Sequence, residues 1–598
     1  MSNSQLDNQD LHALRHSAEH VMHQAVKELF PQVQLAMGPA TDDGFYNDFD
    51  PSPKDVTPVE VTDKDFPRIE TRMRELINLN LPITRHEINE AEAKKLFRGN
   101  PYKLEWLKDI VTKGEPITVY WTGEPGASNS MVDLCRGPHL KSTGDIKAFK
   151  LLSVAGAYWH GSEKNKMLTR IYGTAFASEA DLKDHLWRLD EAKRRDHRTL
   201  GKELDLFVIS DDIGKGLPLL TPKGTIIRNA ILEYERALEF QAGFTEVWTP
   251  HIAKNDLYKR TGHWDHYRDV MYAPFGIDED TYVLKPMNCP HHYMIYASKP
   301  RSYKDLPMRL SEPGTCYRYE KSGELGGLTR VRALTIDDSH ILMTDNQIDA
   351  EFNRCIELVL KMFAAFGLKD YWVRLSLNDP ADHVKYIADS EIWKKAGEKL
   401  EAIVKANQLQ YEVGQGEASF YGPKLDFMVK DAIGRAWQMS TLQLDLFMGK
   451  RLGLTYTNSE GGESHPVILH LGLTGSLERT IGLLIEHFAG AFPLWLAPIQ
   501  AAVIPIGENH QVYAKLITER LKERGLRVEL CDQAESMQKR IRTAEKQKTP
   551  YMLIVGDKEM QAETVSVRVR GQKEGRVQPL ADFLSQTVKL HTTKSLEL

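Results

Sequence analysis

The stretch "TCYRYEKSGELGGLTRVRALTIDDSH", residues 315–340, predicts the fold of the central part of the chain. Two runs of strand-forming residues flank a loop rich in glycine and glutamate, a pattern that predicts a pair of antiparallel strands. Arg318 and Glu320 share one face of the first run because side chains alternate along a strand. Arg330 and Arg332 share one face of the second run for the same reason. Guanidinium groups match phosphate oxygens, so these strands fit a triphosphate, although a surface ladder of salt bridges explains the pattern equally well.

Residues 205–497 surround these strands and predict one domain of the α+β class. Strand-like runs such as "KLDFMVK" and "HPVILHLGL" alternate with long helical segments, which favours a largely antiparallel sheet. The run "LGLTGSLERTIGLLIEHFAG" places Arg479 near the start of an apolar helix, where a cation is unfavourable unless an anion binds nearby. The chain contains neither a G-x-x-x-x-G-K-[ST] loop nor a G-x-G-x-x-G turn that opens a βα unit. A nucleotide would therefore bind here on an antiparallel sheet.

Three regions flank this central domain. In residues 1–178, short strands and helices alternate with turn signals, an α+β pattern. Residues 179–204 read as one charged helix between domains, with Ser178 as its N-cap. Residues 498–598 follow a βαβ order, which predicts a small α/β domain with a mainly parallel sheet.

The bulk composition is typical of a multidomain globular protein. The chain has 598 residues, of which 41% are hydrophobic, and a net charge of −6 that argues against a uniformly basic nucleic-acid coat. No apolar run approaches the roughly 20 residues of a membrane span, and no export signal opens the sequence. The five dispersed cysteines do not make a disulfide scaffold, so we expect a cytoplasmic protein with no membrane partner.

The segment "KPMNCPHHYM" crowds metal-capable side chains around Cys289. No second cysteine lies two to four residues away, as a closed structural zinc site requires. Cys289 is therefore either a buried thiol or one ligand of a metal whose other ligands lie far along the chain.

A second group of metal-capable residues lies in "RHSAEHVMHQA" and "MVDLCRGPHL". His16 and His20 share one face of a helix, and the H-x-x-E-H pattern is also that of the inverzincin metalloproteases. Cys135 and His139 are four apart in a segment that Gly137 and a proline make a turn. These residues ligate zinc, line a hydrolytic pocket without metal, or, for the histidine pair alone, form an ordinary helix face.

Taken together, these segments resemble the class II aminoacyl-tRNA synthetases. "GFTEVWTP" resembles their first motif, "CYRYE" their second and "GLTGSLER" their third. A finer resemblance, to the threonyl-tRNA synthetase family, rests on "GHWDHY", "KPMNCP", "SFYGPKLDF", "WQMSTLQLD", "GFYNDFD" and "LTRIYGTAF", and covers essentially the whole chain. It implies an editing domain (1–178), a linker helix (179–204), a class II catalytic domain (205–497) and an anticodon-binding domain (498–598).

The resemblance implies a catalytic zinc ion on Cys289, His340 and His470, with His291 and His292 taking no part. Three protein ligands leave zinc an open position. An apolar pocket separates threonine from valine poorly, whereas zinc would bind both the amino group and the hydroxyl of threonine. The implied activity is ATP-dependent attachment of L-threonine to tRNA(Thr) through a threonyl-adenylate.

An editing site is implied for the same reason of specificity. Serine also offers an amino group and a hydroxyl, and a missing methyl is worth only about 1–3 kcal/mol, a range that comes from other synthetases. Hydrolysis of mischarged Ser-tRNA(Thr) is implied at His16, His20, Cys135 and His139, with Asp133 nearby. We favour a pocket without metal.

The remaining implied sites bind ATP, threonine and tRNA. Mg²⁺ accompanies ATP. The catalytic residues are Arg318, Arg330, Arg479 and Lys424; ATP binds Arg318, Glu320, Arg330, Gln438 and Arg479; and Asp338, Tyr421 and Thr441 contact the substrate. Glu559 and Arg568 are candidates for anticodon contacts, and the basic run "QKRIRTAEKQK" contacts the tRNA backbone or is simply a solvated helix face. The first motif implies a homodimer.

Several features depart from the family pattern or favour another function. Since the implied editing domain starts at the first residues, we expect the ubiquitin-like domain that commonly opens the family to be absent. Ile336, Ser339 and His160 replace the usual Gln, Ala and Arg. A zinc metallohydrolase built on "HSAEH" would need a third ligand and leaves the arginine motifs unexplained. A sensor that binds tRNA or threonine without catalysis is the remaining alternative, and aminoacylation of purified tRNA would decide against it.

Overall fold

The computed structural model describes residues 8–54, 56–387, 389–531 and 534–598. The chain divides into two compact units, Met1–Asp190 and Glu191–Leu598. Among the described residues, no helix has the length and apolarity needed to cross a bilayer. The same residues include five cysteines, all of which are free thiols.

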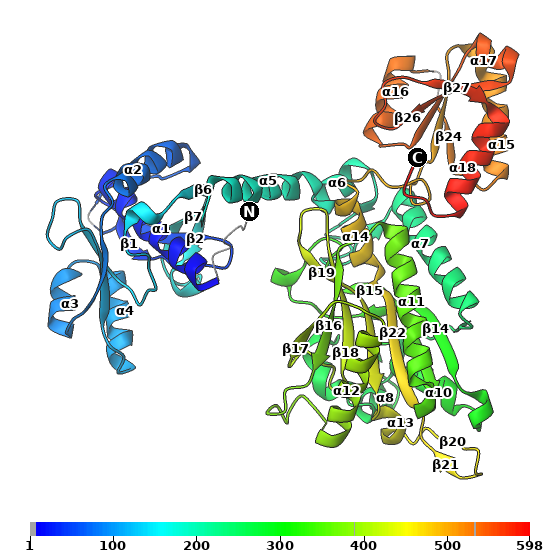
Figure 1. Cartoon of the computed structure of the whole chain (residues 1–598), viewed down its shortest axis with the longest axis horizontal. Coiled ribbons are helices and arrows are strands. Elements are labelled where there is room, and N and C mark those ends of the chain that lie inside the picture. Colours follow the sequence, from blue (N-terminus) through cyan, green and yellow to red (C-terminus); the bar gives the residue numbers. More distant parts are fainter. Residues whose placement is uncertain (1–7, 55, 388, 532–533) are drawn as a thin grey trace. The chain divides into compact units, whose positions relative to one another are not determined.

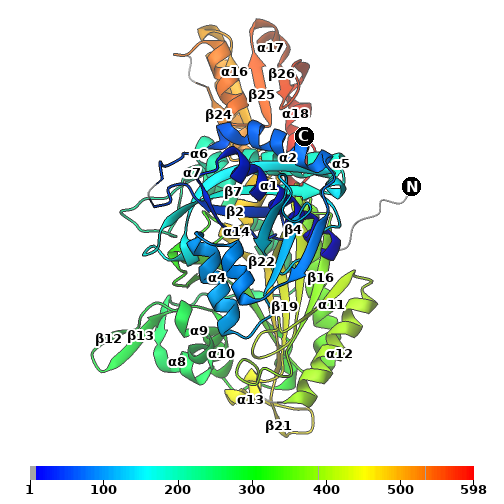
Figure 2. The same ribbon diagram turned by 90° about the vertical axis from the view of Figure 1, so that its left-hand side faces the viewer.

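In the first unit, a long helix, α1 (Asn8–Leu29), packs against an antiparallel sheet with the order β1-β2-β7-β6 (Figure 2). The sheet consists of β1 (Gln34–Met37), β2 (Phe45–Asp50), β6 (Ala148–Tyr158) and β7 (Met167–Phe176). Val21 and Met22 of α1 bury their side chains against Phe49 and Ile171 of the sheet. Helix α2 (Phe66–Asn78) completes this core, which holds the buried face of α1 in a fixed position.

A second, three-stranded sheet in the same unit has the order β3-β4-β5. Its elements are β3 (Ile83–Glu87), β4 (Thr118–Thr122) and β5 (Met131–Leu134), joined by helices α3 (Glu90–Leu96) and α4 (Pro101–Thr112). Strand β5 ends directly before Cys135, so this sheet delivers the turn that carries Cys135 and His139.

Residues 179–204 form two helices, so the prediction of one helix is wrong. Helix α5 (Glu179–Arg195) starts as expected, because the Ser178 hydroxyl accepts a hydrogen bond from the Asp181 amide. Asp196 then leaves the helical conformation and caps α6 (His197–Glu203), accepting hydrogen bonds from the amides of Arg198 and Thr199. A carboxylate that satisfies free amides at a helix start stabilises this break.

The centre of the second unit is an eight-stranded sheet with the order β10-β14-β15-β22-β19-β18-β16-β17 (Figure 1). Its strands are β10 (Thr245–Glu246), β14 (Met308–Tyr317), β15 (Ala333–Met343), β16 (Tyr371–Leu377), β17 (Tyr411–Gln415), β18 (Lys424–Lys430), β19 (Ala436–Asp445) and β22 (Val467–Ser476). The five inner pairings, from β14 to β16, are antiparallel, whereas the two edge strands pair in parallel. The expectation of a largely antiparallel sheet is confirmed.

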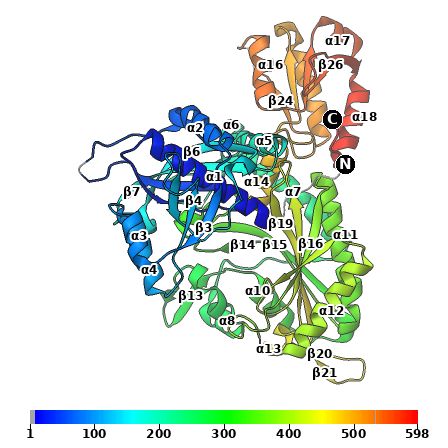
Figure 3. The same ribbon diagram turned by 60° about the vertical axis from the view of Figure 1, so that its left-hand side comes forward.

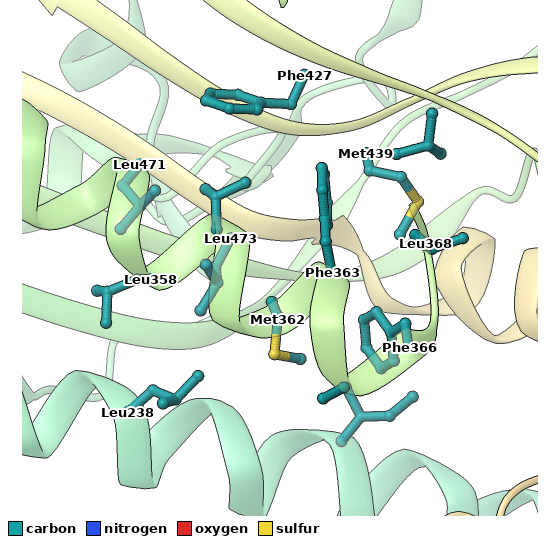
Figure 4. Close-up of a cluster of buried hydrophobic side chains, with 14 of the residues drawn as sticks. Leu238, Leu358, Met362, Phe363, Phe366, Leu368, Phe427, Met439, Leu471 and Leu473 are labelled. Atoms are coloured by element: carbon teal, nitrogen blue, oxygen red, sulfur yellow. The ribbon is translucent and has the colours of Figure 1, made fainter. Parts of the chain in front are cut away.

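Long helices cover this sheet. Four helices do so (Figure 3). Helices α11 (Ile348–Phe366) and α12 (Ser390–Ala406) run along the sheet, and α7 (Pro222–Gln241) and α14 (Leu477–His487) join them. Figure 4 shows Met362, Phe363 and Phe366 of α11 beside Leu471 and Leu473 of β22. This apolar layer leaves the other face of the sheet for polar side chains.

Smaller elements complete the central domain. They are β8 (Phe207–Val208), β9 (Leu219–Leu220), β11 (Ile252–Lys254), α8 (Asn255–Arg260), α9 (His263–Tyr267), β12 (Phe275–Ile277), β13 (Asp280–Leu284), α10 (Cys289–Ala297), α13 (Met448–Arg451), β20 (Tyr456–Thr457) and β21 (Glu463–Ser464). Helix α10 matters most for the site because Cys289 is its first residue.

The C-terminal sheet has the order β24-β23-β25-β26-β27. Its elements are β23 (Ala501–Pro505), α15 (Gln511–Glu523), β24 (Val528–Leu530), α16 (Met537–Lys546), β25 (Tyr551–Val555), α17 (Asp557–Ala562), β26 (Thr564–Val569), β27 (Arg576–Pro579) and α18 (Leu580–Thr592). The first three strands in this order are parallel, but β26 and β27 are antiparallel. The expected mainly parallel sheet is therefore mixed. The connection from β25 to β26 holds only the short helix α17, and the connection from β26 to β27 is a turn, so neither is the long crossover that a parallel pair requires.

Candidate active site and metal centre

Cys289, His340 and His470 come together in the second unit. Cys289 begins α10, while His340 on β15 and His470 on β22 are direct cross-strand partners. One ligand atom from each of the three residues lies within 4.8 Å of the others. All three side chains are buried, and the two imidazole centroids are 4.6 Å apart.

The hydrogen bonds around this cluster fit a bound cation. His470 Nε2 lies 3.2 Å from Asp445 Oδ2, which leaves Nδ1 of the same ring for a metal. His340 Nε2 is buried and has no hydrogen-bond partner among the described residues. Buried polar atoms normally have such a partner, so this nitrogen is free to bind a metal. Burial raises the pKa of the Cys289 thiol and lowers the pKa of His340, so a cation is needed to hold a thiolate here. One sulfur and two imidazoles suit zinc.

Two side chains with expected substrate contacts border the cluster. The Tyr421 ring stacks on His470, with centroids 4.8 Å apart, and its hydroxyl donates to Gln443 Oε1 at 2.7 Å. Asp338 Oδ2 accepts a hydrogen bond from Asn288 Nδ2 at 3.2 Å. The structure therefore places both residues next to the predicted metal ligands.

The arginines of the opening stretch gather around Arg479. Burial lowers the pKa of Arg479, and the nearby charges of Arg318 and Arg330 lower it further. Arg330 Nε donates to Glu320 Oε2 at 3.0 Å, so Glu320 offsets part of the positive charge. A group of guanidinium ions whose charge is only partly offset is a site for a polyanion such as a triphosphate.

Asp426 is a site residue that sequence reasoning missed. This carboxylate is 1% exposed on β18 and accepts hydrogen bonds from Gln438 Nε2 at 2.8 Å and Thr441 Oγ1 at 3.0 Å. Lys424 Nζ lies 2.8 Å from its second oxygen. Three of the residues predicted to bind substrate or ATP are therefore oriented by a single buried anion, which also accepts from Ser376 Oγ at 2.8 Å.

His292 is not a member of the metal-capable cluster, in line with the expectation, but it contacts one of the predicted ligands. Its Nδ1 lies 2.8 Å from Nδ1 of the predicted ligand His340, because residue 292 is nearly one helical turn beyond Cys289 on α10. His291 does match the expectation, since both of its ring nitrogens are buried without a hydrogen-bond partner among the described residues.

The predicted editing residues form a second cluster, in the first unit. Cys135 Sγ lies 3.3 Å from His16 Nε2 and 3.2 Å from His139 Nε2, and the His20 and His139 centroids are 4.2 Å apart. Burial raises the pKa of Cys135 to about 12 and lowers that of His16 to about 4, so thiol and imidazole are neutral near pH 7. This set is also able to hold a metal ion.

Asp133 lies behind the editing cluster rather than within it. Its carboxylate pairs with Lys103 Nζ at 2.5 Å and with His23 Nδ1 at 2.9 Å. Burial alone would raise the pKa of Asp133, but Lys103 and His23 outweigh it and lower the pKa well below its usual range. A cavity of about 480 Å³ is lined by His16, His20, Lys103, Trp106, Asp133 and Cys135, among others. The cavity gives a substrate access to the cluster.

The candidate anticodon residues lie in the C-terminal domain. Glu559 in α17 accepts a hydrogen bond from the Gly556 amide at 3.0 Å, and Arg568 on β26 pairs with Glu545 at 2.5 Å. In the basic run of α16, Arg540 is buried and donates to the Pro505 carbonyl at 2.8 Å, so it is not available to a tRNA backbone.

The three departures have different surroundings. Ser339 Oγ donates to the buried carboxylate of Glu239 at 2.7 Å. Ile336 packs against a small apolar cluster that includes Cys316. His160 pairs with Glu105 at 3.1 Å, and its ring lies 5.5 Å from that of Trp106 at the editing cavity.

Three family profiles match the chain. Residues 275–488 match the "tRNA synthetase class II core domain (G, H, P, S and T)", residues 500–590 match the "Anticodon binding domain", and residues 117–172 match the "Threonyl and Alanyl tRNA synthetase second additional domain". The matched ranges contain Cys289, His340 and His470 in the first profile and Cys135 and His139 in the third.

Known proteins are similar over nearly the whole length. A threonine–tRNA ligase of Rubrobacter xylanophilus is 49% identical over 563 residues, which are 94% of this chain and 86% of that protein. A threonine–tRNA ligase of Thermus thermophilus is 47% identical over 596 residues, 98% of this chain and 89% of that protein. A solved structure described as the RNA binding domain of threonyl-tRNA synthetase from Cryptosporidium parvum has a TM-score of 0.64 and 32% identity, and covers 67% of this chain and 99% of that one.

Proposed function

The chain belongs to the threonine–tRNA ligase family, and we propose that Cys289, His340 and His470 hold the zinc ion by which it selects threonine. Its activity is the ATP-dependent attachment of L-threonine to tRNA(Thr) through a threonyl-adenylate. The zinc proposal rests on one observation: one thiol and two imidazoles come together, and one imidazole has a buried nitrogen with no hydrogen-bond partner in the described part of the chain.

Threonine selection would follow from the open position of that site. A zinc ion on three protein ligands supplies an electrophilic centre with room for an amino group and a β-hydroxyl. Tyr421 stacks on His470 and closes one side, while Asp338 supplies a carboxylate for the substrate amino group. Valine has no hydroxyl and would leave this polar site unsatisfied, so it is rejected strongly.

ATP would bind on the arginine group. Arg318, Arg330 and Arg479 meet the phosphate charge together with Mg²⁺, and Glu320 contacts the nucleotide base. Lys424, Gln438 and Thr441 line the adenylate pocket around Asp426. Catalysis of adenylate formation is then mainly positioning and electrostatic stabilisation of the charge that builds at the α-phosphate.

Editing would take place in the cavity of the first unit. The second additional domain supports hydrolysis of mischarged Ser-tRNA(Thr). We assign His16, His20, Cys135 and His139 to this pocket, with neutral imidazoles near pH 7 available as proton acceptors. Asp133 acts through Lys103 and His23, which it holds in place. We propose that this pocket works without metal.

Assembly and tRNA binding complete the proposal. The C-terminal domain binds the anticodon, with Glu559 and Arg568 as base contacts. A homodimer would bury Phe240 at the end of α7 and Trp248 after β10, which are 81% and 75% exposed in the single chain. The protein would work in the cytoplasm, where tRNA is charged.

Amino-acid-dependent exchange of pyrophosphate into ATP tests this function. We expect exchange with threonine, and at least about 100-fold less with valine, since a site built for a hydroxyl rejects an analogue without one. Equal exchange with both amino acids would rule out the proposed zinc selection. Light scattering of wild-type protein and Trp248→Glu tests the homodimer, which the added charge should dissociate.

A further inference from the structure

We propose that His292 is a positioning residue that fixes the tautomer and orientation of His340 toward the zinc ion, an inference that rests on the proposed zinc site. His292 is buried behind His340, on α10. It links the ligand to a buried ion pair formed by Glu312 and Lys285.

The first link is a hydrogen bond between two imidazoles. His292 Nδ1 and His340 Nδ1 are 2.8 Å apart, and the two rings are nearly perpendicular, at 86°. One of the two nitrogens must carry the shared proton, because a neutral imidazole has one donor and one acceptor nitrogen. If His292 donated, His340 would carry its proton on Nε2, where no acceptor among the described residues lies within hydrogen-bond distance and the Asp338 carboxylate is 3.7 Å away. His340 therefore donates from Nδ1 and keeps the lone pair of Nε2 free for a metal.

The second link fixes the proton of His292. Since His292 Nδ1 accepts from His340, its proton sits on Nε2, which lies 3.2 Å from Glu312 Oε2. His292 thus accepts on one side and donates on the other, and no other tautomer satisfies both contacts. The donor and the acceptor of both hydrogen bonds, from His340 to His292 and from His292 to Glu312, are therefore fixed.

The third link anchors the carboxylate itself. Glu312 on β14 accepts from the Thr249 amide and hydroxyl, both at 2.8 Å, and Lys285 Nζ lies 3.6 Å from it. Glu312 is 3% exposed and Lys285 is fully buried, so the pair is not screened by solvent. The hydrogen bonds from Thr249 and the charge of Lys285 stabilise the ionised form of Glu312 and hold its carboxylate in place beside His292.

The other histidine ligand is held differently. His470 Nε2 meets the carboxylate of Asp445 directly at 3.2 Å, with the Tyr293 hydroxyl 3.3 Å away. Metal-ligating histidines generally use their second nitrogen in this way, and loss of the partner typically costs 10–100-fold in metal affinity. In this chain, His470 has its carboxylate partner directly, whereas His340 reaches Glu312 through His292.

His292→Leu tests the inference, with His291→Leu as the matched control on the same helix. The zinc dissociation constant of each purified full-length variant is measured by competition with a chelator. We expect His292→Leu to weaken zinc binding about 10–100-fold and His291→Leu to leave it within about twofold. His292→Gln, whose amide accepts and donates as His292 does, should restore most of the affinity.

A spectroscopic readout separates positioning from a general loss of packing. In the cobalt-substituted protein, the visible bands of the metal should shift in His292→Leu and stay unchanged in His291→Leu. If circular dichroism shows that His292→Leu is unfolded, His292→Phe is used in its place, because phenylalanine keeps an aromatic ring in the core. Wild-type affinity and an unchanged cobalt spectrum in the apolar variant would overturn the inference alone, whereas a wild-type protein that binds no zinc would overturn the proposed function as well.

Discussion

His340 and His470 stand directly opposite each other on the antiparallel strands β15 and β22, with their ring centroids 4.6 Å apart. The same pairing in the sheet that builds the core therefore also brings together two of the three proposed metal ligands. Cys289 joins them from the first residue of α10. In the proposed zinc site, specificity for threonine would depend on the register of one strand pair, which the apolar layer beneath it fixes.

Asp426 should be indispensable for adenylate formation. Asp426→Ala removes the shared partner of Lys424, Gln438 and Thr441, so all three side chains lose their fixed orientation. Misplacement by about 1 Å is enough to lower a rate by about 100-fold, and we expect at least that loss in pyrophosphate exchange. Ser376→Ala, which removes one hydrogen bond to the same carboxylate, should cost far less. Comparable losses in both variants would contradict the orienting role.

His20 should matter for editing and not for charging. His20→Ala should slow deacylation of Ser-tRNA(Thr) by about 100-fold or more, as expected for the loss of a proton-transfer group. Threonylation should remain at the wild-type rate, since the first unit has its own hydrophobic core. The control is His86→Ala, an exposed residue of β3 that does not line the cavity. Unimpaired deacylation in His20→Ala would remove His20 from the editing site.

Buried acids of α7 should make the stability of the catalytic domain depend on pH. Burial raises the pKa of Glu239 to about 7, and burial also raises the pKa of Glu235. The folded chain therefore binds more protons than the unfolded chain between about pH 4.5 and 7. This contribution to stability is fully present below pH 4.5 and is lost as the pH rises through 7.

Thermal unfolding of Glu239→Gln at pH 6 and pH 8 checks this sign. Glutamine keeps an oxygen for the Ser339 hydroxyl and cannot ionise, so the variant should be more stable than wild type at pH 8, by about 1–3 kcal/mol. Glu233→Gln, at an exposed position of the same helix, should show the pH dependence of the wild type. A wild-type protein that gains stability between pH 6 and 8 would contradict the prediction.

Strand patterns could be read from the sequence because they depend on local periodicity. The antiparallel pair around residues 315–340 is confirmed, but the prediction that Arg318, Glu320, Arg330 and Arg332 lie on its strands is wrong, because β14 ends at Tyr317 and β15 begins at Ala333. These residues lie in the connection, where Glu320 still meets Arg330. The mixed C-terminal sheet could not be read so directly, because apolar runs of five residues do not show whether the neighbouring strand is parallel. The break at Asp196 did have a signal, an N-cap residue inside a helical pattern.

The site was less accessible to sequence reasoning than the fold. Local spacing left Cys289 as either a thiol or a ligand, and only resemblance pointed to His340 and His470, because strand register over a long separation is invisible in spacing. Asp426 lies two residues after Lys424 in a buried strand, so an acid on an apolar segment was the available signal. The role of His292 depends on a contact with β15 that no local pattern encodes.

The zinc content of the purified full-length chain tests the central claim most directly. Metal analysis should find one zinc ion per wild-type chain and almost none in Cys289→Ser, which replaces the thiolate with a poor zinc ligand. Cys355→Ala, a buried cysteine of α11 outside the cluster, should retain the wild-type content. A wild-type chain without zinc, or Cys289→Ser with a full equivalent, would contradict the proposed metal centre.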